Sequence, residues 1–283
     1  MKLVRYGDVG SEKAGLIDKQ GRIRQLVDIV DDITPEALHP KNLDQILAAD
    51  PEKLPIVMTE QRIGACITHF QKFLAIGLNY TDHAEETGAK APSEPIVFSK
   101  QLNCVVGPND DVLLPRGSVK SDWEVELGVV IGKQAKYIKE GQALDYVAGY
   151  CTVNDISERE YQIERQGQWT KGKSCDTFGP IGPWLVTKDE VKDPQNLRLW
   201  LDLNGKSMQD GSTKDMIFGV EEIVAYVSKF MTLMPGDLIC TGTPAGVGLG
   251  KKPQIFLKAG DVMTLGVKGL GDQRQKVVAD PEA

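Results

Sequence analysis

Short runs of apolar residues, bounded by Gly, Pro, Asn or Asp, dominate the sequence from Phe73 to the C-terminus. Runs of roughly four to eight such residues are typical of strands in a sheet. One run places leucine at every second position over residues 197–203, and Asn204-Gly205 follows it. An Asn-Gly pair supplies the two positive-φ residues that a tight hairpin turn needs. The sequence therefore predicts a mostly β fold, with a hairpin at this point.

Helical periodicity is confined to a few segments. Apolar residues recur at i, i+3, i+4 and i+7 between Val220 and Met231, which predicts an amphipathic helix. A second helix is expected at Leu43–Ala48, where prolines flank the segment. Residues 1–66 otherwise consist of short alternating runs and turns. We therefore expect an α+β, predominantly β fold, with a small N-terminal β-rich domain over residues 1–66 and a larger domain over residues 67–283.

The composition narrows the possible partners. The formal net charge is −7, and the charges of both signs are interspersed, so no basic stripe is present that would bind nucleic acid. The five cysteines lie far apart and form no CxxC pair, which is typical of reduced thiols rather than of a disulfide framework. No apolar stretch of about 18 residues is present to span a membrane. We expect a cytoplasmic protein with no membrane or nucleic-acid partner.

Two glutamates lie within the segment Asp122–Gly132, DWEVELGVVIG. On a strand, the period of two puts Glu124 and Glu126 on one face. Asp155 comes just after the next strong apolar run. Neighbouring carboxylates repel unless a cation lies between them, and Mg²⁺ and Mn²⁺ prefer carboxylate oxygens. These acids therefore predict a metal site, although such a pair on a strand is more often a solvated face.

A histidine and a glutamate lie three residues apart in the segment GLNYTDHAEE. If Asp82 begins a helical turn, His83 and Glu86 face the same way. A carboxylate beside an imidazole selects its tautomer and raises its basicity, which suits a general base near neutral pH. The pair therefore predicts a base that activates water. The alternative is a surface histidine on a short polar helix.

Three side chains further along the sequence have the chemistry to bind an anion. Lys173 offers positive charge for a substrate carboxylate or an oxyanion. Arg159 and Gln162 are one helical turn apart, and a guanidinium binds carboxylates bidentately. Each of the three is also typical of a solvated surface. The glycine-rich segment 246–251 lacks the first glycine and the Ser or Thr of a phosphate-binding loop, so we interpret it as backbone that approaches another group closely.

Several segments occur in an order and spacing that resembles the fumarylacetoacetate hydrolase family. They are GLNYTDHAEE, EPIVFSK, DWEVELGVVIGK, YVAGYCTVNDISERE, WTKGKSCDTFGPIGPWLVT, LNGK and PGDLICTGTPAGVG. The resemblance begins near Phe73 and implies a mixed β-sandwich roll as the catalytic domain, Mg²⁺ or Mn²⁺ as the cofactor, and a homodimer or homotetramer. The segments MKLVRYG and QDGSTKDMIFGV are closest to bacterial members of the 2,4-dioxo-3-deoxy-L-rhamnonate or L-fuconate hydrolase type.

Carried over position by position, the resemblance assigns the residues singled out above to one pocket. It implies metal ligands at Glu124, Glu126 and Asp155, catalytic roles for His83, Glu86 and Lys173, and substrate contacts from Arg159, Gln162, Tyr80 and Thr243. In relatives the segment around the histidine behaves as a lid.

The implied reaction is hydrolysis of a carbon–carbon bond in a 2,4-dioxo sugar acid, which gives pyruvate and a hydroxy acid. A divalent cation would stabilise the enolate that forms, and His83 with Glu86 would deprotonate the attacking water. The same residues would also suit an oxaloacetate decarboxylase, another acylpyruvase or a ureidoglycolate lyase. A β-rich binding module is the alternative that is not an enzyme.

Overall fold

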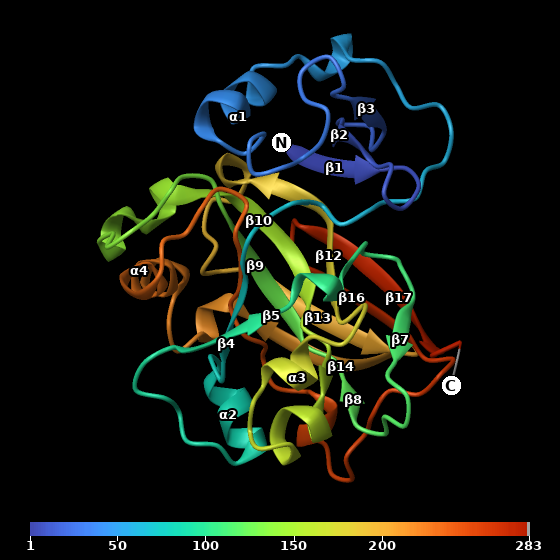
Figure 1. Cartoon of the computed structure of the whole chain (residues 1–283), viewed down its shortest axis with the longest axis vertical. Coiled ribbons are helices and arrows are strands. Elements are labelled where there is room, and N and C mark those ends of the chain that lie inside the picture. The colour runs from blue at the N-terminus through green and yellow to red at the C-terminus, as the bar shows by residue number, and fades with distance from the viewer. Residues whose placement is uncertain (282–283) are drawn as a thin grey trace.

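The computed structural model describes residues 1–281, and a ten-stranded sheet forms its centre (Figure 1). The strand order is β3-β2-β1-β12-β10-β9-β15-β4-β5, and β6 pairs with β12. In chain order these strands are β1 (Lys2–Tyr6), β2 (Lys13–Ile17), β3 (Ile23–Gln25), β4 (Phe73–Gly77), β5 (Ile96–Lys100), β6 (Val105–Val106), β9 (Val125–Ile131), β10 (Val147–Asn154), β12 (Gly179–Thr187) and β15 (Leu238–Cys240). Strands β4, β9, β10 and β15 are buried along their whole length, which explains their continuous apolar runs.

A five-stranded sheet in the order β14-β13-β16-β17-β7 packs against the central sheet. Its strands are β7 (Val112–Leu114), β13 (Arg198–Leu203), β14 (Lys206–Ser212), β16 (Val262–Val267) and β17 (Gly271–Ala279). The layers are also joined by polar groups, since Nε2 of Gln273 donates to the carbonyl oxygen of Thr152 at 2.8 Å. A small separate pair is formed by β8 (Ser121–Asp122) and β11 (Ser157–Glu158). The predicted α+β sandwich, mostly β, is confirmed.

The predicted hairpin joins β13 to β14. Asn204 and Gly205 form its turn, with φ angles of 53° and 76°. Leu199, Leu201 and Leu203 are buried, whereas the residues between them are more exposed. The alternating leucines therefore mark the face of the strand that packs into the core.

The α-helices are few and short. They are α1 (Pro40–Leu47), α2 (Thr81–Thr87), α3 (Thr170–Lys173) and α4 (Val220–Phe230). The first and last of these confirm the helices predicted near residues 43–48 and 220–231. In Figure 1, α2 and α3 lie at the end of the molecule opposite the N-terminal strands. Within residues 1–281, no helix is both long and apolar enough to cross a membrane.

The N-terminal strands extend the central sheet instead of forming a sheet of their own. Leu3 on β1 pairs with Leu185 on β12 in antiparallel register, and β2 and β3 follow outward. The amino group of Met1 also donates to Thr187. Strands from both sides of the expected boundary, between residues 66 and 67, thus belong to one sheet. The division into two domains stays a prediction.

Candidate active site

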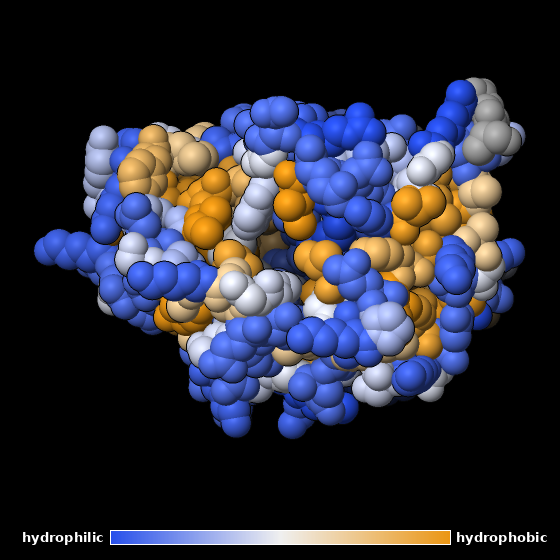
Figure 2. All heavy atoms as spheres, turned by 90° about the horizontal axis from the view of Figure 1, so that it is seen from below, coloured by the Kyte–Doolittle hydropathy of each residue, from blue (hydrophilic) through white to orange (hydrophobic). Residues whose placement is uncertain are grey.

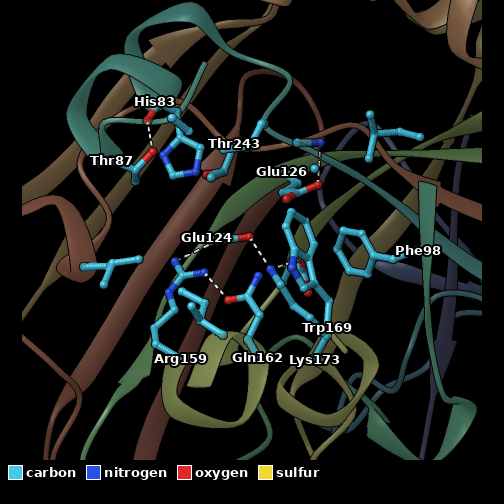
Figure 3. A pocket seen from close by; sticks show the side chains of 18 residues that line it. His83, Thr87, Phe98, Glu124, Glu126, Arg159, Gln162, Trp169, Lys173 and Thr243 are labelled. Carbon is cyan, nitrogen blue, oxygen red and sulfur yellow. Dashed lines mark hydrogen bonds and ion pairs between the residues drawn. The ribbon is translucent and has the colours of Figure 1, made fainter. Parts of the chain in front are cut away.

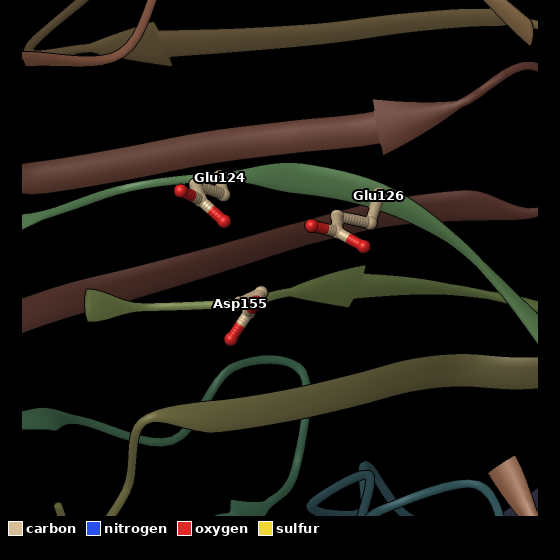
Figure 4. Close-up of side chains that lie close together, drawn as sticks. All are labelled: Glu124, Glu126 and Asp155. Carbon is tan, nitrogen blue, oxygen red and sulfur yellow. The ribbon is translucent and has the colours of Figure 1, made fainter. Parts of the chain in front are cut away.

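Three carboxylates lie side by side where β9 begins and β10 ends. Glu124 immediately precedes β9, Glu126 lies on it, and Asp155 follows β10. The antiparallel register, which pairs Glu126 with Val153, brings the three side chains together. Figure 4 shows the group, in which one oxygen from each of the three residues lies within 4.8 Å of the other two. All three residues are buried, so they form a charged cluster inside the protein and not a solvated strand face.

Two buried lysines neutralise part of this charge. Nζ of Lys173, at the end of α3, donates to Glu124 at 2.7 Å and to Asp155 at 2.8 Å. Nζ of Lys100, the last residue of β5, lies 2.6 Å from the other oxygen of Asp155 and donates to the carbonyl of Lys173. Sequence reasoning singled out Lys173 but missed Lys100. The only signal for Lys100 was its place at the end of the EPIVFSK run.

Glu126 differs from the other two acids in its surroundings. Within residues 1–281, its carboxylate is hydrogen-bonded to the backbone N–H of Gly242 at 2.7 Å and forms no ion pair. Burial, together with Asp155 and Glu124, raises the pKa of Glu126 well above its usual range. Burial also acts to raise the pKa of Glu124, but Lys173 and Arg159 outweigh it and lower that pKa to about 2.

This donor set fits a divalent cation. It consists of carboxylate oxygens, which hard ions such as Mg²⁺ and Mn²⁺ prefer. The repulsion around Glu126 is of the kind that a bound cation relieves. Glu124, Glu126 and Asp155 are therefore the residues that would hold the metal.

Arg159 is fixed beside the cluster at the start of a π-helical turn, Glu160–Glu164. Its Nη2 lies 2.8 Å from Glu124 and 2.8 Å from Asp122, and its Nε donates to Asp122 at 2.8 Å. Its Nη1 donates to Oε1 of Gln162 at 3.0 Å. Sequence reasoning predicted the Arg159 and Gln162 pair but did not single out Asp122, although Asp122 opens the DWEVE segment. The guanidinium is thus held in one orientation at the edge of the pocket.

His83 and Glu86 lie on α2, and His83 faces the carboxylates across the pocket (Figure 3). Nδ1 of His83 lies 3.0 Å from Oε1 of Glu86. Glu86 does not line the pocket, and both of its oxygens accept from the backbone N–H of Gly246, at 2.9 and 3.0 Å. The arrangement leaves Nε2 of His83 as the ring nitrogen that is available to a reacting molecule.

The two remaining predicted residues differ in their placement. Thr243 lines the pocket, and its hydroxyl donates to the carbonyl of Val125 at 2.9 Å and accepts from Gln209 at 2.7 Å. Tyr80 is fully buried just before α2 and does not line the pocket. The structure therefore does not bring Tyr80 to the position expected for a substrate contact.

Large apolar side chains also line the pocket, which sequence reasoning did not predict. The rings of Phe98 and Trp169 meet edge to face, with centroids 5.2 Å apart, and Ile163 and Leu249 lie on the same pocket. Ile163 is 50% exposed. Figure 2 views the molecule from this end and shows a hollow with both hydrophobic and hydrophilic side chains around it. The pocket therefore combines buried charged groups with Phe98, Trp169, Ile163 and Leu249, which are together called the apolar wall here.

The chain is similar to known proteins over most of its length. A family model described as fumarylacetoacetate (FAA) hydrolase C-terminal matches residues 72–278. A protein of Burkholderia orbicola (strain MC0-3) that carries the name hydrolase is 58% identical over 277 residues, which cover 98% of this chain and 98% of that protein.

Two solved structures show the same fold over nearly the whole chain. Fumarylacetoacetate hydrolase from psychrophilic Exiguobacterium antarcticum is 32% identical, with a TM-score of 0.89 over 99% of this chain and 100% of that one. The 2-hydroxyhepta-2,4-diene-1,7-dioate isomerase of Mycobacterium marinum is 31% identical, with a TM-score of 0.77 over 99% of each chain. The chain is thus similar to enzymes, a hydrolase and an isomerase among them.

Proposed function

The chain belongs to the fumarylacetoacetate hydrolase family, and from this premise we propose that it hydrolyses the C3–C4 bond of a 2,4-dioxo-3-deoxy sugar acid. The products are pyruvate and a hydroxy acid. One observation carries the proposal: a histidine held by a carboxylate and a cluster of three buried carboxylates line a single pocket from opposite sides.

A Mg²⁺ or Mn²⁺ ion held by Glu124, Glu126 and Asp155 would supply Lewis-acid charge to the oxygens of the dioxo acid. Arg159 and Lys173 add cationic groups next to these ligands. A guanidinium and an ammonium there bind the carboxylate of the substrate and offset negative charge that develops on its oxygens.

His83 is the residue that takes a proton from water. Because Glu86 binds Nδ1, Nε2 accepts that proton. The water oxygen bonds to C4, the C3–C4 bond breaks, and its electron pair goes to C3. A proton is then added at C3 to form the methyl group of pyruvate. The base, the cations and the carboxylates therefore have separate tasks in one reaction.

The apolar wall supports a particular kind of sugar acid. Derivatives of rhamnonate and fuconate end in a methyl group, which an apolar surface accommodates better than it does a hydroxymethyl group. Phe98, Trp169, Ile163 and Leu249 offer such a surface in the same pocket as the charged groups. The terminal methyl group would lie on this wall, and the dioxo acid end would lie on the carboxylates and cations.

A substrate panel tests the proposal. Purified protein is assayed for pyruvate release from 2,4-dioxo-3-deoxy sugar acids and simple acylpyruvates, and for turnover of oxaloacetate and ureidoglycolate. Each assay is run with Mg²⁺, with Mn²⁺ and with a chelator. We expect metal-dependent pyruvate release, fastest with the 6-deoxy sugar acids.

Two results would reject the proposal. Efficient turnover of oxaloacetate without hydrolysis of any dioxo acid would assign a decarboxylase, because that reaction needs no attacking water. Rearrangement of an unsaturated oxo acid without pyruvate release would assign an isomerase, an activity named for one of the similar structures.

A further inference from the structure

Asp122 is fully buried, does not line the pocket and takes no part in the reaction described above. Its Oδ2 accepts from Nε of Arg159 at 2.8 Å, lies 2.8 Å from Nη2 of the same residue, and accepts from the backbone N–H of Leu249 at 3.0 Å. Its Oδ1 accepts from the backbone N–H groups of Gly248 at 2.6 Å and Trp123 at 2.9 Å. One carboxylate thus binds both a cation of the pocket and a distant loop.

That loop is the glycine-rich segment 246–250, here called the glycine loop. At one end, the N–H of Gly246 donates to both oxygens of Glu86. At the other end, a Cβ on Gly250 would lie 2.6 Å from the Glu86 carboxylate. Between them, a Cβ on Gly248 would lie 1.9 Å from the carbonyl oxygen of Ile255. The glycines therefore let the backbone approach Glu86 and Asp122 at the same time.

We propose that Asp122 is a positioning residue, which sets the place of the His83–Glu86 dyad relative to Arg159 by holding the glycine loop and the guanidinium together. The proposal rests on the proposed function, because it assigns Asp122 a role in the same reaction. The path runs from Asp122 through the amides of Gly248 and Leu249 to the amide of Gly246, and from there to Glu86.

An aspartate suits this position better than its closest analogue. An ionised carboxylate only accepts hydrogen bonds, and the four hydrogen-bond partners of Asp122 are all donors. An asparagine of the same shape has one accepting oxygen and an NH₂ group, and this NH₂ group would face N–H donors on one side. In either orientation Asp122→Asn therefore disturbs an amide of the glycine loop, and in one of them also the guanidinium of Arg159, without changing the size of the side chain.

A matched control is available at Asp237. This residue is also fully buried, lies 2.9 Å from Nζ of Lys72, and accepts from the backbone N–H groups of Lys72 and Met234 at 3.0 and 2.8 Å. It holds a turn that does not line the pocket. Asp237→Asn thus reproduces the loss of a buried, ion-paired carboxylate without touching the glycine loop.

Amide hydrogen exchange of the Mg²⁺-loaded full-length protein tests the structural half of the proposal. In Asp122→Asn, we expect the amides of Gly248 and Leu249 to exchange about 10- to 100-fold faster than in the wild type, because their hydrogen bonds to a charged acceptor are lost. The amide of Gly246, in the same loop, should also exchange faster. In Asp237→Asn, exchange of these amides stays as in the wild type. Unchanged exchange of the loop in Asp122→Asn would overturn the proposal.

A double-mutant cycle on kcat tests the functional half. We expect Asp122→Asn to lower kcat about 10- to 100-fold, as loss of a supporting carboxylate typically does. Because Asp122 acts through Glu86, Glu86→Gln should then lower kcat by a smaller factor in the Asp122→Asn background than in the wild type. In the Asp237→Asn background, Glu86→Gln should lower kcat by the same factor as in the wild type. If Glu86→Gln lowers kcat by the same factor in all three backgrounds, Asp122 is merely structural.

Gly250→Ala provides a second route if Asp122→Asn does not fold. It leaves Asp122 in place, but the added Cβ would lie 2.6 Å from the Glu86 carboxylate, so the glycine loop and Glu86 must move apart. We therefore expect faster exchange at Gly246 and a lower kcat. Wild-type exchange and wild-type kcat in this variant would contradict the proposal. If the wild type turns over none of the panel substrates, the proposed function fails, whereas the exchange data still decide whether Asp122 holds the loop.

Discussion

Nδ1 of His83 and Oε1 of Glu86 lie 3.0 Å apart, one helical turn from each other on α2, and the N–H of Gly246 binds the same carboxylate. Glu86 is therefore held by a second partner from a different part of the chain, at position 246. The orientation of the imidazole depends on this carboxylate, and a general base depends on the tautomer that the carboxylate selects.

Substitution of Glu86 by glutamine tests the role of this pair. The variant keeps the shape of the side chain but removes the charge that stabilises a protonated His83. We expect kcat for pyruvate release to fall on the order of 100-fold or more, which is the range of general base catalysis. Glu85→Gln serves as the control, since Glu85 is the exposed neighbour on the same helix. Equal activity of the two variants would remove Glu86 from the mechanism.

Metal binding is expected to depend on Glu126. In Glu126→Gln we expect weaker binding of Mn²⁺ by calorimetry, on the order of 100-fold or more, because a charged oxygen ligand is lost. The wild type should also gain about 2.7 kcal/mol of stability when the free metal is 100 times its Kd, and the variant should gain much less at the same concentration. Asp111→Asn, an exposed change, should bind as the wild type does. Undiminished Mn²⁺ affinity in Glu126→Gln would rule out this ligand.

The apolar wall is expected to control selectivity. Ile163→Ala removes part of the surface that would meet a terminal methyl group, and Ile163 is exposed enough for the fold to tolerate the change. A methyl contact typically changes selectivity about 10-fold or more. In Ile163→Ala, the preference in kcat/KM for 6-deoxy acids over their 6-hydroxy analogues should therefore fall several-fold. Val119→Ala, an exposed change that does not line this pocket, should keep the preference. An unaltered preference in Ile163→Ala would place the substrate tail elsewhere.

Asp18, which directly follows β2, makes the stability of the fold depend on pH. Burial acts to raise the pKa of Asp18, but hydrogen bonds from the amides of Arg22 and Gln20 and from the guanidinium groups of Arg24 and Arg22 hold it well below its usual range. The folded-state pKa is lowered, so the ionised carboxylate stabilises the fold above its unfolded-state pKa of about 4. This contribution is lost as the pH falls through the folded-state value.

Asp18→Asn should therefore be less stable than the wild type at pH 7, and the difference should shrink as the pH falls below about 4. Urea unfolding at a series of pH values measures both effects. Asp8→Asn, an exposed change nearby, should show little difference at any pH. A difference between Asp18→Asn and the wild type that grows on acidification would contradict the sign of this argument.

Local patterns were enough to predict several parts of the fold and the site. The hairpin around Asn204 and Gly205 follows from alternation and from the turn itself, and α4 follows from the spacing of its apolar residues. His83 and Glu86 face the same way because helical geometry relates positions i and i+3. Each of these features depends on residues within one or two turns of the chain, so the sequence by itself determines them.

Other parts were decided only by the tertiary structure. Lys100 reaches Asp155 across 55 positions of the chain, and Asp122 reaches Gly248 across 126. No periodicity relates such pairs, because their approach depends on how whole strands and loops pack. The same holds for β1 and β12, whose paired residues Leu3 and Leu185 are 182 positions apart in the sequence. The sequence by itself thus determined the local elements and the carboxylates that suit a metal. Packing alone decided which cations, amides and apolar side chains surround those carboxylates.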